Sequence, residues 1–306
     1  MMPLRRPVSL ADRLPPTAGR VQADAPLAPG TWFRVGGAAE ALVRPSSATD
    51  LAAFLAALPH DVPVMVLGAA SNIIVRDGGV HGVVLRLGRG FGDVRVEADG
   101  IVAGAAALDA TVAEYAATAG LAGLEFLSGI PGTIGGAVCM NAGAYGSDVA
   151  ACLDWAEIIT RSGQHSRLPA SALALAYRHA SLPPGTIVTR ARFRAHPGDP
   201  ATIAARMATI RANREATQPV RARTGGSTFR NPDGGARAWE LIDAVGGRGL
   251  MQGGAQVSEK HCNFLLNTGT ATAADLEGLG ETVRADVQSK LGVNLEWEIK
   301  RIGRPS

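Results

Sequence analysis

The 306-residue chain has few of the residues that mark secreted, metal-binding or membrane-inserted proteins. Its cysteines, Cys139, Cys152 and Cys262, are odd in number and lack Cys-x-x-Cys spacing, which argues against a disulfide framework and against a zinc site. No run of 18 apolar residues occurs, and Arg5 and Arg6 are not followed by an apolar signal segment. We therefore expect a cytoplasmic protein with no membrane segment and no bound metal.

Lysine is also scarce, so arginine supplies nearly all of the positive charge. The 30 basic residues exceed the 27 acidic ones by a formal charge of +3, and no block of five like charges occurs. The absence of a basic patch with interleaved aromatic residues argues against nucleic-acid binding, whereas a small positive excess suits an anionic small molecule. Glycine, in contrast, is abundant, with 38 residues that cluster inside apolar segments.

Hydrophobic periodicity predicts helices and strands without a regular βαβ alternation, which favours an α+β fold over a doubly wound sheet. Within residues 186–195, Ile187, Ala191 and Phe193 alternate with arginines, as in a half-exposed strand. The Pro/Gly-rich break from His196 to Pro200 predicts a boundary that separates an arm (1–26) and a first domain (27–196) from a second domain (197–306). The expected helices are 47–58, 109–119, 203–218, 238–245 and 276–287, and the expected strands are 62–67, 72–75, 82–87, 94–98, 101–105, 186–195 and 294–302.

Two glycine-rich segments are the main candidates for a ligand site. They are LGAASNIIVRDGG (67–79) and GIPGTIGGAVCMNAGAYG (129–146). Small residues let phosphate oxygens reach backbone N–H groups, although each segment alone is also consistent with tight turns that pack one backbone on another. No G-x-G-x-x-G, Gly-Lys-Ser/Thr or G-x-S-x-G motif occurs, which excludes a Rossmann dinucleotide site, a P-loop and a nucleophile elbow.

Four further segments carry polar residues in unusual settings. TGGSTFRNPDGG (224–235) holds Ser227, which is either a turn former or a hydroxyl aimed into a site. Tyr177-Arg178 either clamps an anion or is an ordinary surface pair, in which Arg178 packs its aliphatic stem on the protein and keeps its charge in water. GGAQVSEKHCNFLLN (253–267) contains His261, which we interpret as structural. In LEWEIKRIG (295–303), Glu298 is predicted opposite an apolar face, where it would pair with Lys300 or serve a site.

The order of these segments, preceded by TWFRVGG (31–37), resembles the UDP-N-acetylenolpyruvoylglucosamine reductase family over residues 27–303. The resemblance implies an FAD-binding domain of the vanillyl-alcohol-oxidase (PCMH) type in two α+β subdomains, followed by an α+β substrate-binding domain. The short link from Arg178 to the strand at Thr186 resembles the shorter subtype, which lacks an inserted loop with a substrate-capping tyrosine. The implied flavin site comprises Arg34, Gly68, Ala69, Ala70, Ser71, Asn72, Pro131, Gly132, Thr133, Gly135, Gly136, Asn141, Gly143 and Ala144. The family often has glycine at the position of Ala70, and alanine is tolerated there if its φ is negative.

The implied activity is NADPH-dependent reduction of UDP-N-acetylglucosamine enolpyruvate to UDP-N-acetylmuramate through FAD, in peptidoglycan synthesis. By the same resemblance, Ser227 donates a proton to the substrate carbanion. Arg178 and Glu298 stabilise the enolate, a role that suits Glu298 best in its protonated form. The implied substrate contacts are Tyr177, Arg214, Asn231, Gln256, Lys260 and Lys300.

Two alternatives remain open at this point. An FAD-linked alcohol oxidase of the same flavin-binding superfamily would keep the glycine-rich segments but would give no reason for Ser227, Arg178 and Glu298. A non-catalytic nucleotide-binding or scaffolding protein would leave the ordered C-terminal segments unexplained. We expect a monomer whose partner is a small molecule, the UDP-sugar enolpyruvyl ether.

Overall fold

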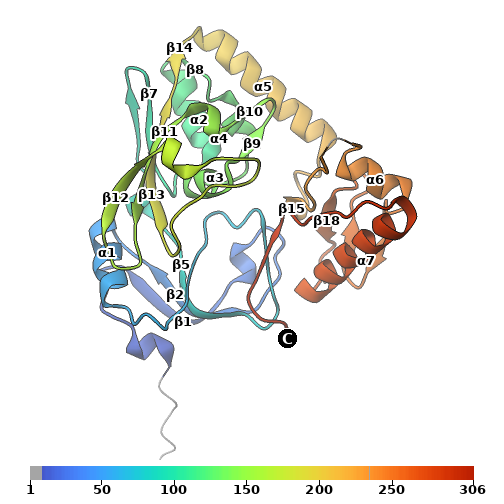
Figure 1. The fold of residues 1–306 in the computed structure, drawn as a ribbon, viewed down its shortest axis with the longest axis horizontal. Helices are drawn as coiled ribbons and strands as arrows, with labels where there is room; N and C mark the ends of the chain where they lie inside the picture. The colour runs from blue at the N-terminus through green and yellow to red at the C-terminus, as the bar shows by residue number, and fades with distance from the viewer. Residues whose placement is uncertain (1–8, 234) are drawn as a thin grey trace, which may run out of the picture.

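The computed structural model describes residues 9–233 and 235–306, and its first unit is a mixed four-stranded sheet. The order is β1–β2–β5–β3, antiparallel between β1 and β2 and parallel in the other two pairs (Figure 1). Helix α1 (Ala48–Ala57) packs on this sheet through Leu51, Phe54 and Leu55, and the Ser47 hydroxyl caps it by accepting the N–H of Asp50. The bounds are η1 Leu10–Arg13, β1 Arg20–Pro26, η2 Ala28–Gly30, β2 Ala38–Arg44, β3 Val64–Val66, β5 Val80–Leu85 and η3 Arg89–Phe91.

Strand β1 corrects the expectation of an irregular arm that extends to residue 26. Residues 20–26 pair with β2 at every position except Asp24, although only Ala25 of β1 is buried. An edge strand with so little apolar periodicity gives a weak sequence signal, because backbone hydrogen bonds rather than side-chain burial hold it. Residues 1–8 of the predicted arm lie outside the described residues.

The second unit is a five-stranded antiparallel sheet in the order β12–β11–β13–β7–β6. Its inner face packs on α2 and α3, and the alternation predicted for β13 is confirmed, with Ile187, Ala191 and Phe193 buried. The bounds are β6 Val94–Glu97, β7 Gly100–Gly104, α2 Asp109–Thr118, β8 Leu121–Ala122, η4 Glu125–Gly129, α3 Ile134–Met140, β9 Gly143–Ala144, β10 Ser147–Asp148, α4 Val149–Cys152, β11 Leu153–Ile159, β12 His165–Pro169, η5 Ala170–Leu173, β13 Ile187–Arg194 and β14 His196–Pro197.

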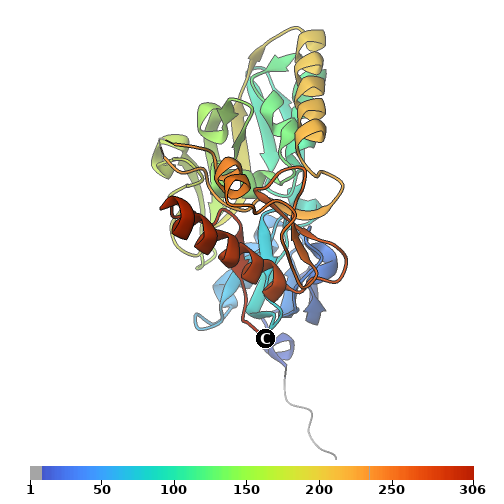
Figure 2. The same cartoon turned by 90° about the vertical axis from the view of Figure 1, so that its right-hand side faces the viewer.

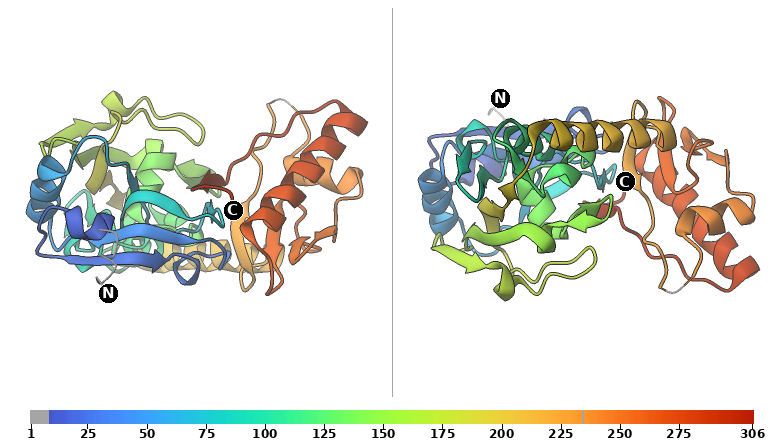
Figure 3. Two further views of the ribbon diagram at one scale, coloured as in Figure 1. Left: turned by 90° about the horizontal axis from the view of Figure 1, so that it is seen from below. Right: turned by 90° about the horizontal axis from the view of Figure 1, so that it is seen from above.

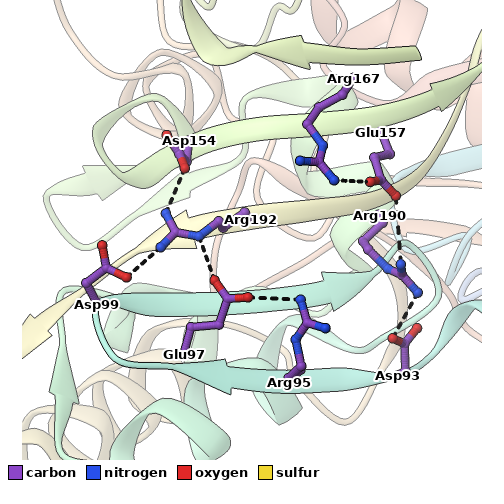
Figure 4. A network of polar contacts seen from close by, with 9 residues as sticks. All are labelled: Asp93, Arg95, Glu97, Asp99, Asp154, Glu157, Arg167, Arg190 and Arg192. Atoms are coloured by element: carbon purple, nitrogen blue, oxygen red, sulfur yellow. Dashed lines mark hydrogen bonds and ion pairs between the residues drawn. The ribbon is translucent and has the colours of Figure 1, made fainter.

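The outer face of this sheet carries a network of arginines and carboxylates (Figure 4). Arg192 lies at one centre of it, with 13% of its side chain exposed, and donates to Glu97 at 2.9 Å, Asp99 at 2.6 Å and Asp154 at 2.7 Å. Arg190 bridges Glu157 on the neighbouring strand β11 and Asp93, which lies just before β6. The arginines that alternate with the apolar residues of β13 are therefore neutralised by cross-strand partners rather than left free for an anionic ligand.

Helix α5 (Pro200–Thr217) connects the second unit to the C-terminal domain (Figures 1 and 3). The side chain of Asp199 caps its first turn, and Ile203 and Met207 pack into the core of the second unit. Packing therefore joins most of α5 to the first domain, beyond the break at residue 197 that the sequence suggested.

The C-terminal domain packs helices α6 and α7 on an antiparallel sheet in the order β15–β18–β17–β16 (Figure 2). Its core also includes Phe33, Val35 and Ile74 from the first unit. The bounds are β15 Arg223–Ser227, α6 Ala238–Ala244, β16 Met251–Gln252, β17 Ala255–Val257, β18 Phe264–Asn267 and α7 Ala273–Leu291. Mixed helices and strands in three packed units confirm the predicted α+β class.

The chain end returns to the first unit and ties the domains together. Strand β19 (Lys300–Ile302) pairs in parallel with β4 (Ile73–Val75), and Arg76 donates to both carboxylate oxygens of Glu277 on α7, at 2.8 and 3.1 Å. The prediction of a strand over residues 294–302 is wrong for its first six residues. That segment crosses between domains and bonds to a loop, so it has no regular neighbouring strand.

Candidate active site

A cleft of about 600 Å³ opens where the two subdomains meet the C-terminal domain. Both glycine-rich segments line it, as do residues from the Arg178 turn, from the Ser227 strand and from the chain end. Its volume and its mostly apolar wall with a few polar groups are typical of small-molecule sites. The predicted site residues in its wall are Gly68, Ala69, Ala70, Ser71, Asn72, Pro131, Gly132, Thr133, Gly135, Gly136, Gly143, Ala144, Arg178, Arg214, Ser227, Glu298 and Lys300.

Two glycines of the glycine-rich segments have no room for a side chain: Gly68 faces the second segment, and Gly132 faces Asp109. A Cβ added to Gly68 would lie 2.5 Å from Thr133 Oγ1, and one added to Gly132 would lie 2.6 Å from Asp109 Oδ2. Such a cradle fits the diphosphate of a dinucleotide, which needs small residues to reach the backbone. Some of the predicted amide donors are occupied, however, because the N–H groups of Ile134 and Gly135 donate to carbonyls of Ala107 and Ala105.

Ala70 adopts a conformation that the sequence did not anticipate. Its φ is +51°, in the left-handed region, whereas the expected tolerance of alanine assumed a negative φ. The residue is buried, and its carbonyl accepts the N–H of Trp32 at 3.3 Å. This close packing holds the turn in a conformation that glycine adopts with less strain.

Arg178 lies in a tight turn that a buried asparagine supports. The backbones of Ala176 and His179 exchange two hydrogen bonds across the turn, and Asn141 Nδ2 donates to the Ala176 carbonyl at 2.9 Å. Arg178 itself has a φ of +54°, and its guanidinium stacks over the ring of Tyr177. Asn141 is absent from the cleft wall, so its side chain supports this turn instead of facing the expected flavin.

The turn directs Arg178 onto Glu298. Arg178 Nε donates to Glu298 Oε1 at 2.6 Å, and the two side chains are 21% and 11% exposed. The backbone of Glu298 is fixed from two sides, because Asn72 Nδ2 donates to its carbonyl and its N–H donates to the carbonyl of Thr228, next to Ser227. Long-range contacts thus converge on one pair of charges, and the alternative pairing of Glu298 with Lys300 is not formed.

The arrangement can bind an anion and stabilise negative charge. Arg178 suits a carboxylate, since its guanidinium presents several donors in a fixed plane. Arg214 and Lys300 supply two further cations in the cleft wall, and burial lowers the pKa of the Arg214 guanidinium. Glu298 is paired with Arg178 in this structure, and the protonated form that the resemblance implies for it beside the enolate stays a prediction.

The remaining predicted residues lie outside the cleft wall. Arg34 is exposed and donates to the carbonyl of Pro29, and Tyr177 is 54% exposed beside its neighbour Arg178. In the C-terminal domain, Asn231 accepts the N–H of Ala238, Gln256 lies within β17, and Lys260 donates to the Glu215 carbonyl. Within the described residues, no cluster of His, Cys, Asp or Glu could hold a metal, and no helix is long and apolar enough to span a bilayer.

Two polar residues in the cleft wall had no role assigned from the sequence: Cys139, whose role stayed open, and Asp109. Burial raises the pKa of the Cys139 thiol, against the opposing charge of Lys300, so this cysteine packs as a neutral group. Asp109 is fully buried, and neither carboxyl oxygen has a hydrogen-bond partner in the described part of the chain. The signal was a single acid inside the apolar run AGAAALDATVA, which was interpreted only as a helix start.

Comparisons with known proteins agree with this geometry. Residues 39–168 match a family model described as an FAD binding domain, and residues 218–302 match that of the C-terminal domain of UDP-N-acetylenolpyruvoylglucosamine reductase. The chain is 67% identical to the UDP-N-acetylenolpyruvoylglucosamine reductase of Acidiphilium cryptum, covering 95% of this chain and 94% of that one. It is 66% identical to that of Granulibacter bethesdensis, covering 94% and 92%. The crystal structure of the Thermus caldophilus reductase superposes with a TM-score of 0.81 at 35% identity, covering 93% of this chain and all of that one.

Proposed function

Because the chain belongs to the UDP-N-acetylenolpyruvoylglucosamine reductase family, we propose that it reduces UDP-N-acetylglucosamine enolpyruvate to UDP-N-acetylmuramate for peptidoglycan synthesis. It is an FAD-dependent oxidoreductase by its family and its FAD-binding domain. The reductant in this proposal is NADPH. The observation that carries the proposal is the meeting of Arg178, Glu298 and Ser227 with both glycine-rich segments in one cleft.

FAD fits the cleft through the cradle formed by Gly68 and Gly132, where side chains are excluded on both segments. When bound, this cofactor supplies hydride exchange, first with NADPH and then with the vinyl carbon of the enol ether. The protein contributes the electrostatics. Arg178 binds the substrate carboxylate and stabilises the negative charge that develops beside it during hydride transfer.

The resting salt bridge defines a proton step in this scheme. A substrate carboxylate that binds Arg178 competes with Glu298, which lies only 2.6 Å from the same guanidinium. Loss of that pairing frees the Glu298 carboxyl group, which is 11% exposed in the cleft wall, to face the substrate. In our proposal Glu298 then takes up a proton and donates a hydrogen bond to the enolate, while Ser227 delivers a proton to the carbanionic carbon.

The negatively charged diphosphate of the substrate calls for the cations in the cleft wall. We assign Arg214 and Lys300 to the diphosphate, because both line the cleft and neither forms a salt bridge within the described residues. Tyr177, Asn231, Gln256 and Lys260, which lie outside the cleft wall, are proposed as further substrate contacts. A monomeric enzyme in the cytoplasm, where UDP-sugars and NADPH are found, completes the proposal.

An anaerobic absorbance experiment tests the reaction. The flavin absorbance band at about 450 nm should bleach with NADPH and return when enolpyruvyl-UDP-N-acetylglucosamine is added. A band that returns only with oxygen would favour the oxidase alternative. A protein that takes up no FAD would refute the enzyme assignment.

Stopped-flow kinetics then test the role of Ser227. Ser227→Ala should leave reduction by NADPH near normal and slow reoxidation by the substrate about 10²-fold, because only the second half-reaction needs its proton. Ser289→Ala, in the exposed last turns of α7, is the matched control and should behave as wild type. Unchanged reoxidation in Ser227→Ala would remove this serine from the mechanism.

A further inference from the structure

Asp109, the first residue of α2, is a buried acid without a partner. Its relative exposure is 0%, and neither carboxyl oxygen accepts or donates a hydrogen bond within the described residues. An unpaired buried polar group costs free energy, so it is rare in native structures and calls for a specific explanation. Nothing in the catalytic scheme above uses this side chain.

The position of Asp109 connects it to the cofactor cradle. Its N–H donates to the carbonyl of Gly132 at 3.2 Å, and Oδ2 occupies the space next to the Gly132 Cα, where a Cβ would lie only 2.6 Å away. The next residue, Thr133, faces Gly68 of the other glycine-rich segment. Asp109 therefore lies behind the point at which the two segments approach each other, and it lines the same cleft.

No charge in the neighbourhood explains the acid. The charged residues in the wall of this cleft are Arg86, Arg178, Arg214, Glu298 and Lys300, and none of them bonds to Asp109. Burial alone raises the pKa of its carboxyl from 3.8 to about 8. At neutral pH the group is therefore a carboxylic acid with one O–H to donate.

We propose that Asp109 is a cofactor-binding residue whose neutral carboxylic acid donates a hydrogen bond to the diphosphate of FAD, at the junction of the two glycine-rich segments. An ionised carboxylate would repel that diphosphate, whereas the neutral acid supplies a donor where small residues leave room for phosphate oxygens. The inference rests on the FAD binding of the proposed function and adds a contact that needs a proton on Asp109.

Titration of FAD onto the stripped protein tests this contact, with flavin fluorescence as the readout. Asp109→Leu should weaken binding about tenfold at pH 7, because it removes one hydrogen bond to a charged group. Asp109→Asn keeps an N–H donor and should bind within about threefold of wild type. Wild-type affinity should fall as the pH rises above about 8, where the acid ionises, and Asp109→Asn should lack that fall. Asp61→Leu, an exposed acid elsewhere, is the control.

Thermal unfolding of the FAD-free protein separates a binding role from a structural one. Asp109→Leu should unfold at the same temperature as wild type or a higher one, since it removes an unpaired buried acid. A lower unfolding temperature for both Asp109 variants would assign the residue to the fold and overturn the proposal. Equal FAD affinity in wild type and Asp109→Leu would overturn this proposal alone. A wild-type protein that binds no FAD would overturn the proposed function as well.

Discussion

Gly136 and Gly135 are adjacent in α3, yet the structure predicts opposite effects when each is replaced by alanine. Gly136 is exposed to the cleft, and the nearest atom to an added Cβ is Thr133 Oγ1 at 3.9 Å. Alanine is a better helix former than glycine, so Gly136→Ala should raise the stability of the FAD-free protein by about 0.5–1 kcal/mol. The open space around Gly136 is therefore not required by the fold itself.

The same methyl group should weaken cofactor binding. Gly136 follows the cradle residues Gly132 and Thr133 in the cleft wall, where the FAD of our proposal approaches the backbone. We expect Gly136→Ala to lower FAD affinity at least about tenfold, or roughly 1.4 kcal/mol. At Gly135 an added Cβ would lie 3.0 Å from the Cβ of Ala105 and 3.2 Å from its carbonyl oxygen, which already accepts the Gly135 N–H at 2.9 Å. Because that hydrogen bond holds the helix in place, the added methyl group cannot be accommodated by a shift of α3, and Gly135→Ala should destabilise the protein by about 1–3 kcal/mol.

Urea unfolding of the FAD-free variants, followed by FAD titration, measures both effects. The expected pattern is a higher midpoint with weaker binding for Gly136→Ala, and a lower midpoint for Gly135→Ala. A loss of stability in Gly136→Ala would show that the space beside Gly136 is needed for packing. An FAD affinity of Gly136→Ala equal to that of the wild type would place the cofactor elsewhere. Either result would refute the reasoning from the cleft wall.

Three further predictions concern backbone strain, the arginine network and pH. Ala70→Gly should stabilise the protein against thermal unfolding by about 0.5–1 kcal/mol, because the φ of +51° at this residue suits glycine. The neighbouring Ala69→Gly should not stabilise the protein. Equal effects of the two substitutions on the unfolding temperature would contradict the prediction. Arg192→Met should lower the free energy of unfolding, measured in urea, by about 1–3 kcal/mol, and by less in high salt. Arg95 is 69% exposed at the edge of the network, so Arg95→Met should lower it by less than about 1 kcal/mol. Equal losses for the two variants would refute the central place of Arg192. Burial raises the pKa of Asp109 to about 8 in the folded state, against 3.8 for an ordinary aspartate, so from pH 4 to 8 only the unfolded chain releases its proton. Across that window, the free energy of unfolding of the FAD-free wild type should therefore fall with rising pH relative to that of Asp109→Leu, by at most about 1.4 kcal/mol per pH unit. Parallel pH profiles of the two proteins in chemical denaturation would show that Asp109 titrates normally.

Local periodicity accounts for most of the secondary structure that the sequence predicted. The alternation of Ile187, Ala191 and Phe193 defined both faces of β13, because side chains of a strand alternate whatever its neighbours are. The same rule could not decide between the two environments considered for Glu298, pairing with Lys300 or a place in a site. Leu295 and Ile299 are buried as predicted, but the segment forms no regular strand there, and its polar side faces a turn 120 residues earlier in the chain.

Residues that depend on tertiary contacts could not be placed from sequence patterns. Asn141 and Arg34 lie in segments typical of flavin sites, yet their side chains bond to the backbone of Ala176 and of Pro29. Asp109 shows the converse, since an acid at the start of a helix is ordinary in sequence and only the packing of Gly132 against it makes it unusual. The order of the motifs predicted which segments form the cleft, whereas the orientation of each side chain within it depends on contacts between residues far apart in the sequence.

The charged pair at the centre of the cleft is held in place before any ligand binds. Arg178 keeps a left-handed backbone conformation that costs about 1–2 kcal/mol, and the hydrogen bonds across its turn and from Asn141 offset that cost. Glu298 is held by Asn72 from one glycine-rich segment and by the carbonyl of Thr228, beside Ser227. The groups proposed to bind the carboxylate, stabilise the enolate and deliver the proton are thus positioned through the same few backbone contacts, so substrate binding has to exchange one salt-bridge partner rather than assemble the site.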